Sequence, residues 1–91
     1  MILTMDVGNT NIKTALFNGK EMYKYWRMST NIHSTSDEYG VRLWSMFQRE
    51  GVSTEVVEGI VVSSVVPTIN FTIDHTLQNY FGNRSSCRNW L

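Results

Sequence analysis

The residues best suited to chemistry lie in one short segment, DVGNTN, at residues 6–11. It opens with a carboxylate, which a glycine and several hydroxyl and amide side chains follow closely. A glycine lets backbone N–H groups approach a polyphosphate closely, and hydroxyl and amide groups can donate to its oxygens. A single carboxylate suits magnesium, which prefers few carboxylate contacts together with water and phosphate oxygens. The segment therefore predicts a phosphate-binding loop in which Asp6 positions the metal.

The same residue types also favour a plain hairpin turn, because Gly, Asn and Asp are ordinary turn residues. The setting of the segment must decide between the two readings. Residues 2–7 are mostly apolar, with Leu3, Met5 and Val7 on one face of a predicted strand. Residues 12–17 resume the period of two and predict a second strand. The segment thus joins two strands of a hairpin.

The rest of the chain predicts one more hairpin strand and two helix-containing steps. Asn18-Gly19 favours a two-residue type I′ turn into an antiparallel strand over residues 22–28. Thr35 and Glu38 fit a capping box, so a helix is expected from there to Gly51. The β-branched run at residues 59–66 is typical of a strand covered on both faces. Pro67 then suits the first position of a second helix, which Gly82 ends.

This order, βββαβα, predicts an α/β fold with a mixed sheet. The first three strands are expected to be antiparallel, and the fourth returns parallel to the first by a right-handed crossover. Such an arrangement is the ribonuclease-H-like half-domain of the actin-like ATPase superfamily. Ser63 and Ser64 fall near the end of the parallel strand, where a role in lining a ligand site and a role in packing are equally open.

Composition narrows the class of protein. The 91 residues predict one small domain, and eight basic residues balance eight acidic ones, so charge favours neither nucleic acid nor an anionic membrane as partner. The apolar start is too short for a signal peptide or a membrane span. Cys87, His33 and His75 lack zinc-ligand spacing, and the single cysteine is read as a reduced thiol. We therefore expect a cytoplasmic protein.

Five segments in order, MDVGNTNIKTALFNGKE, YWRMST, SDEYG, GIVVSSVVPT and YFG, resemble the first part of type III pantothenate kinases. The resemblance covers residues 1–82. It implies transfer of the γ-phosphate of ATP to pantothenate, the first step of coenzyme A biosynthesis, with Mg²⁺, a monovalent cation (K⁺ or NH₄⁺) and a homodimer. The family's phosphate loop, with Asp6 as the metal-binding residue, maps onto Asp6, Val7, Gly8, Asn9, Thr10, Asn11, Ile12 and Lys13.

The sequence also departs from this family. Members of the family continue into a second half-domain, which bears the catalytic base. No segment of this sequence resembles that half-domain, so the resemblance assigns no catalytic residue to this chain. Residues 83–91 are polar and are expected to be an irregular tail, from a truncated or frame-shifted sequence. Without a following strand, the edge of residues 59–66 is expected to promote self-association. We expect a kinase fragment that is inactive alone.

Two alternatives stay open. The first is a non-catalytic nucleotide-binding or regulatory module of the same family, which magnesium-ATP titration would separate from an inert fold. The second is a ribonuclease-H-like nuclease, but such enzymes gather several carboxylates around two metals. The predicted parallel strand ends in serines instead of an acid, which disfavours the nuclease.

Overall fold

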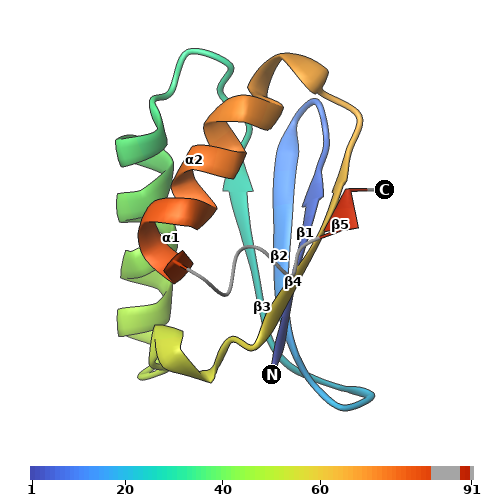
Figure 1. Cartoon of the computed structure of the whole chain (residues 1–91), viewed down its shortest axis with the longest axis vertical. Helices are drawn as coiled ribbons and strands as arrows, with labels where there is room; N and C mark the ends of the chain where they lie inside the picture. The colour runs from blue at the N-terminus through green and yellow to red at the C-terminus, as the bar shows by residue number, and fades with distance from the viewer. Residues whose placement is uncertain (83–88, 91) are drawn as a thin grey trace.

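The computed structural model describes residues 1–82 together with Asn89 and Trp90. Its core is a five-stranded sheet in the order β3-β2-β1-β4-β5, with two helices packed against one face (Figure 1). β1 lies in the middle of the sheet, antiparallel to β2 and parallel to β4. The predicted order of strands and helices and the mixed sheet are confirmed.

The first hairpin forms as predicted. β1 (Ile2–Val7) and β2 (Asn11–Asn18) pair antiparallel, and residues 8–10 connect them. Leu3, Met5 and Val7 are buried on the helix side of the sheet, as the alternation predicted. The connection therefore sits at the end of the central strand, near the start of both helices (Figure 1).

The turn into β3 (Glu21–Ser29) differs from the prediction. Asn18 remains in β2 and pairs with Glu21, so Gly19 and Lys20 form the turn. Among the described residues no side-chain-bearing residue has a positive φ, whereas Gly19 has φ 63°. A type I′ turn needs positive φ at both central residues, and a type II′ turn only at the first. The type I′ prediction is wrong, because the glycine takes the first central position.

Helix α1 (Ser36–Arg49) begins with the predicted capping box. The Thr35 hydroxyl accepts from the Glu38 N–H at 3.2 Å, and the Glu38 carboxylate accepts from the Thr35 N–H at 2.9 Å. The bond from the Thr35 N–H holds the pKa of Glu38 below its ordinary value, because it favours the charged carboxylate. The helix is followed by Gly51, which has φ 68°. Both ends of the helix were thus predictable.

After a short 3₁₀ turn at Thr54–Val56, β4 (Gly59–Ser64) returns beside β1. A 3₁₀ turn at Pro67–Ile69 leads into α2 (Asn70–Phe81), which gives Pro67 the predicted first helical position. Both helices cover the same face of the sheet (Figure 1). On the opposite face Val61 is only partly buried, and Ile2 and Tyr25 are exposed. The prediction that β4 is covered on both faces is wrong within the described residues, because a β-branched run does not specify how many faces are covered.

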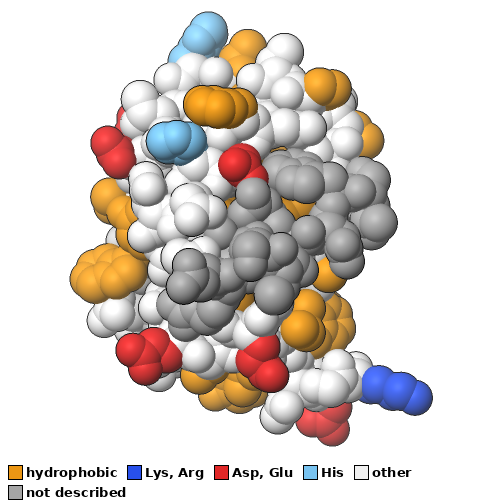
Figure 2. Space-filling view, in the orientation of Figure 1, with side chains coloured by type: hydrophobic (Ala, Val, Ile, Leu, Met, Phe, Trp, Pro, Cys, Tyr) orange, Lys and Arg blue, Asp and Glu red, His pale blue; other side chains and the backbone are white. Residues whose placement is uncertain are grey.

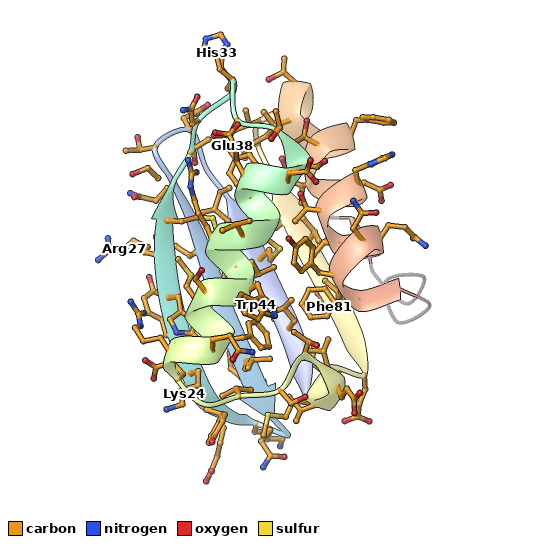
Figure 3. The ribbon with its side chains drawn as sticks, turned by 90° about the vertical axis from the view of Figure 1, so that its left-hand side faces the viewer. Lys24, Arg27, His33, Glu38, Trp44 and Phe81 are labelled. Carbon is orange, nitrogen blue, oxygen red and sulfur yellow. The ribbon has the colours of Figure 1, made fainter. Side chains whose placement is uncertain are left out.

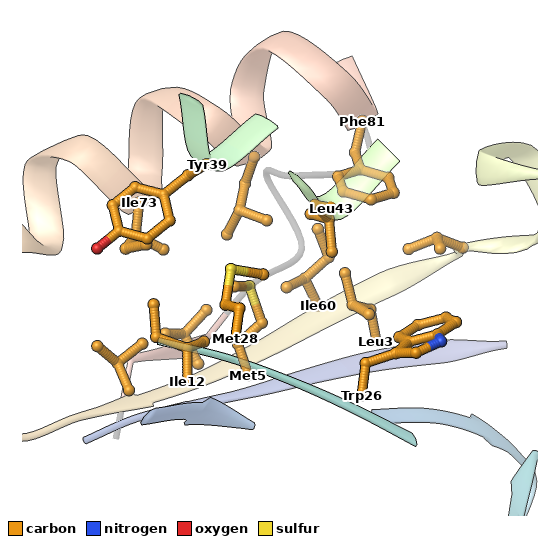
Figure 4. Packing of buried hydrophobic residues seen from close by; sticks show 14 of the residues in the cluster. Leu3, Met5, Ile12, Trp26, Met28, Tyr39, Leu43, Ile60, Ile73 and Phe81 are labelled. Carbon is orange, nitrogen blue, oxygen red and sulfur yellow. The ribbon is translucent and has the colours of Figure 1, made fainter. Parts of the chain in front are cut away.

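The hydrophobic core lies between the helices and the sheet (Figure 4). Phe47 of α1 is at its centre, with its ring centroid 5.2 Å from Trp26 on β3 and 5.9 Å from Phe81 on α2. Apolar side chains also reach the surface in separate groups (Figure 2), including Trp44 and Phe71. None of the helices in the described part of the chain has the length and apolar character that crossing a membrane requires.

The two helices approach most closely at Gly40 of α1. A β-carbon at this position would overlap the Tyr80 ring of α2, and the Thr76 hydroxyl nearby donates to the Ser36 carbonyl at 3.1 Å. We expect Gly40→Ala to lower the free energy of unfolding, since overpacking costs about 1–3 kcal/mol and better helix propensity offsets at most about 1 kcal/mol. In a Tyr80→Ala background the overlap is gone and the same change should stabilise. Urea unfolding of the wild type, the two single variants and the double variant measures this reversal of sign, and equal losses in both backgrounds would contradict it.

The end of the chain requires a third correction. Asn89–Trp90 forms a short strand, β5, parallel to Val61 and Val62 of β4. The prediction of an irregular tail over residues 83–91 is therefore wrong at Asn89 and Trp90. The prediction that the edge of β4 is unpaired is also wrong at Val61 and Val62. Such pairing uses backbone groups at an open edge and does not depend on an apolar pattern. Residues 83–88, with Cys87, and residue 91 lie outside the described residues.

Candidate phosphate-binding site

The site is built around Asp6, near the end of β1. Its side chain is exposed and lies on the sheet face opposite the helices, because Met5 and Val7 on either side of it are buried under them. The register places Lys13 of β2 beside Asp6 on one side and Ser63 of β4 on the other. Directly paired residues share a face of a sheet, so these three side chains form one polar row.

Residues 8–11 close the hairpin at one end of this row. The Gly8 N–H donates to the Asn11 carbonyl at 2.9 Å, so this N–H is engaged within the chain. In contrast, the N–H groups of Asn9 and Thr10 make no hydrogen bond to any other described residue. Both residues are exposed, so two backbone donors and two polar side chains remain available to an anion. Gly8 therefore does not offer its N–H as a donor, but its lack of a side chain lets a ligand approach the backbone closely.

Space around Gly8 is limited by its own turn. A β-carbon there would lie 3.1 Å from the Asn11 carbonyl oxygen, closer than such contacts normally are. A glycine therefore fits this closure without displacing the Asn11 carbonyl, independently of any ligand. The turn explains the glycine at least as well as phosphate binding does, so Gly8 by itself does not distinguish the two readings.

The other residues of the predicted loop divide into anchors and exposed groups. Val7 and Ile12 are fully buried in the core and hold the two ends of the loop to the sheet. Asn11 is partly buried at the start of β2, and Lys13 is exposed. Val7 and Ile12 thus act as supports, whereas Asp6, Asn9, Thr10 and Lys13 present groups to solvent.

The two serines of β4 have different surroundings. Ser63 is paired with Asp6 in the sheet and is partly buried. The Ser64 hydroxyl accepts from the Val66 N–H at 3.1 Å, which stabilises the turn that leaves the strand. Ser63 therefore belongs to the polar row, and the Ser64 hydroxyl belongs to the turn after β4.

Sequence reasoning did not single out two residues that the structure adds to the site. Arg27 on β3 pairs with Lys13 and extends the polar row to the outer strand, away from the helices (Figure 3). Thr30 follows β3 and makes two hydrogen bonds to residues 8–11. The period-two pattern placed Arg27 on the face opposite Trp26 and Met28, but only the register between strands brings it beside Lys13.

The row Arg27–Lys13–Asp6–Ser63 has an uneven charge distribution. Two cations are direct neighbours across β2 and β3, and like charges opposite each other destabilise a sheet. In the described part of the chain neither cation forms a salt bridge, and the Asp6 carboxylate has no salt bridge or hydrogen bond. A bound polyphosphate would relieve the repulsion between the cations and would bring an ion that Asp6 can hold.

The donor set at Asp6 fits magnesium. The carboxylate is exposed and has no partner within residues 1–82. Ser63 is its neighbour in the sheet, and the hydroxyl and amide groups of residues 9–11 follow it closely in the chain. Magnesium uses one or two carboxylates and completes its shell with water and phosphate oxygens. Residues 1–82 contain no group of three or more His, Cys, Asp or Glu side chains arranged for a metal. Two shallow cavities, at residues 48–54 and around Val41, lie away from the loop.

A solved structure shows the class of fold. The chain superposes on a putative N-acetylglucosamine kinase from Porphyromonas gingivalis with a TM-score of 0.70, at 15% identity, over 99% of this chain and 33% of that one. At this identity the likeness shows the fold alone. The chain therefore shares the α/β fold of about a third of that structure.

The family follows from sequence comparison. A family model described as type III pantothenate kinase matches residues 2–88. A type III pantothenate kinase from Exiguobacterium sp. is 45% identical over 84 residues, which are 92% of this chain and 33% of that protein. The chain belongs to the type III pantothenate kinase family. The chain spans about a third of the length of the relatives that it matches. The family match extends to residue 88, six residues beyond the range 1–82 that the quoted segments cover.

Proposed function

We propose that this chain supplies the phosphate-binding part of an ATP-dependent pantothenate kinase. The observation that carries the proposal is the exposed Asp6 carboxylate near the end of the central strand, followed by the N–H groups of Asn9 and Thr10, all without a hydrogen-bond partner among the described residues. Family membership supports ATP as the phosphoryl donor and pantothenate as the acceptor, in the pathway to coenzyme A.

The residues of this chain have separate roles in that proposal. Asn9 and Thr10 hold phosphate oxygens through their N–H groups and side chains, while Lys13 and Arg27 attract the polyphosphate from the sheet. Asp6 and Ser63 hold magnesium, which when bound offsets the negative charge of the phosphates. Positioning and electrostatic stabilisation supply most of what phosphoryl transfer requires. None of these residues is assigned as the base that accepts the proton of the pantothenate hydroxyl.

We further infer, from family membership, that the complete enzyme is a cytoplasmic homodimer that also uses a monovalent cation, K⁺ or NH₄⁺. Among the described residues the edges of the sheet are β3 and the two-residue strand β5, which pairs with Val61 and Val62 of β4. The dimer is therefore not expected to form through Val61 and Val62.

Magnesium-ATP titration followed by amide chemical shifts tests the proposal. We expect the largest shifts at Asn9 and Thr10, because their N–H groups have no partner in the part of the chain that the structure describes, and a smaller one at Gly8, whose N–H is already bonded. The Gly19-Lys20 turn is an internal control, since it is a glycine turn at the other end of β2. Shifts of equal size at both turns, or none at Asn9 and Thr10, would refute the proposed role. Shifts at the loop without turnover in any longer form of the protein would favour the regulatory alternative.

A further inference from the structure

Thr30, the residue after β3, makes two hydrogen bonds to the loop at residues 8–11. Its hydroxyl donates to the Gly8 carbonyl at 2.7 Å, and its N–H donates to the Thr10 carbonyl at 2.9 Å. One residue, 22 positions from Gly8 in sequence, therefore fixes two peptide groups of the loop. This contact joins the third strand to the turn between the first two.

The contact changes the hydrogen bonding of the turn itself. A regular two-residue hairpin between Gly8 and Asn11 would exchange two backbone bonds, one in each direction. Only the bond from the Gly8 N–H to the Asn11 carbonyl is present, and the Gly8 carbonyl accepts from the Thr30 hydroxyl instead. Thr30 thus takes up the carbonyl that the turn would otherwise bond internally.

The two hydrogen bonds from Thr30 favour the binding of an anion by the loop. Carbonyl oxygens repel phosphate oxygens, whereas N–H groups attract them. With the Gly8 and Thr10 carbonyls both bonded to Thr30, the intervening N–H groups of Asn9 and Thr10 have no partner among the described residues. The two bonds therefore occupy the carbonyl acceptors of the loop and leave its N–H donors available to an anion.

Thr30 is itself held in place from α1. The Tyr39 phenol is 1% exposed, accepts from the Asn31 N–H at 2.9 Å and donates to the Asn31 carbonyl at 2.6 Å. A buried side chain that bonds both backbone groups of one residue restricts the peptide units on either side of it. A continuous path of contacts thus runs from α1 through Asn31 and Thr30 to Gly8.

We propose that Thr30 is the positioning residue of the phosphate loop: it orients the N–H groups of Asn9 and Thr10 and does not itself contact the nucleotide. This inference rests on the function proposed above. The hydroxyl is required at this position, and its methyl group is not. Serine is therefore a sufficient replacement and valine, which has nearly the same shape, is not.

The experiment compares Thr30→Val with Thr30→Ser in the full chain, and uses Thr4→Val as the matched control. Thr4 is partly buried in β1, and its hydroxyl makes only a long contact of 3.4 Å to the Ala15 carbonyl. Amide exchange without nucleotide reports on loop order, and magnesium-ATP titration reports on affinity. Loss of one such bond is expected to speed exchange of the bonded Gly8 N–H roughly fivefold and to weaken magnesium-ATP binding by a similar factor. Thr30→Ser and Thr4→Val should leave both values near those of the wild type.

The possible results distinguish positioning by Thr30 from a general loss of stability and from a failure of the proposed function. Faster exchange confined to the loop, with weaker binding that serine restores, supports positioning by the hydroxyl. Unchanged affinity of Thr30→Val in a chain that binds magnesium-ATP would overturn the inference and leave the proposed function intact. Exchange that rises equally throughout the sheet would also overturn it, because that pattern indicates a general loss of stability. Absence of binding in the wild-type chain would instead overturn the proposed function.

Discussion

Asp6→Asn is expected to remove the dependence of nucleotide binding on magnesium. The substitution keeps the shape of the side chain and removes the charge that holds the ion, and comparable changes around metal sites cost on the order of 10–100-fold in affinity. Binding of ATP without magnesium should stay the same or improve, since a negative charge beside the phosphates is lost. Titration of both proteins with ATP, with and without magnesium, measures the two effects separately.

The control for this prediction is Asp37→Asn. Asp37 is also exposed, but it lies in the first turn of α1 and outside the polar row. It should leave nucleotide binding unchanged. Because Asp6 is exposed and makes no salt bridge or hydrogen bond within residues 1–82, its substitution should alter the free energy of unfolding by no more than about 0.5 kcal/mol. A magnesium effect that survives in Asp6→Asn would show that the ion is held elsewhere.

Phe47→Ala is expected to cause the largest loss of stability in this chain. Phe47 is 0% exposed and packs between Trp26 and Phe81, so it joins α1 to the sheet and to α2. Truncation of a buried phenylalanine costs about 3–5 kcal/mol, against a total of about 5–15 kcal/mol for a typical domain. Each kcal/mol lowers the melting temperature of a domain of this size by about 4–8 °C. Thermal and urea unfolding followed by circular dichroism measure the change.

Trp44→Ala provides the comparison on the same helix. Trp44 is 48% exposed and precedes Phe47 by three residues, so the change removes a larger ring from the surface. We expect it to cost clearly less than Phe47→Ala, because about half of the Trp44 side chain already lies in solvent. If Phe47→Ala does not fold, Phe47→Leu still tests the claim, because it keeps most of the volume and should be destabilising to a smaller degree. Equal losses for Trp44→Ala and Phe47→Ala would contradict the central position of Phe47 in the core.

Much of the fold could be predicted because local signals and long-range packing agree in this sequence. The alternation around Leu3 and Met5, the capping box at Thr35 and the glycine after α1 each specify one element. Handedness and sheet rules then leave few ways to connect them. The Asp6 segment was predicted to be a loop for the same reason: its residue types suit a turn, and the flanking strands determine where it lies.

Other features required coordinates because they depend on contacts between distant residues. The bond from Thr30 to Gly8 depends on the pairing of β2 with β3, and Arg27 joins the polar row only through the register of those strands. The type of turn at Gly19 depends on where β2 ends, which a dipeptide signal does not determine. The strand at Asn89–Trp90 has no apolar pattern from which it could be predicted.

The parallel pairing of β1 with β4 has a consequence for how the protein folds. Asp6, Lys13, Arg27 and Thr30 all belong to consecutive hairpins, which can form within microseconds from neighbouring stretches of chain. Ser63 reaches Asp6 only when the long intervening segment closes, a slower step that costs loop entropy. Kinetic refolding experiments should therefore find β1, β2 and β3 protected early, with the serine side of the polar row completed in the rate-limiting phase.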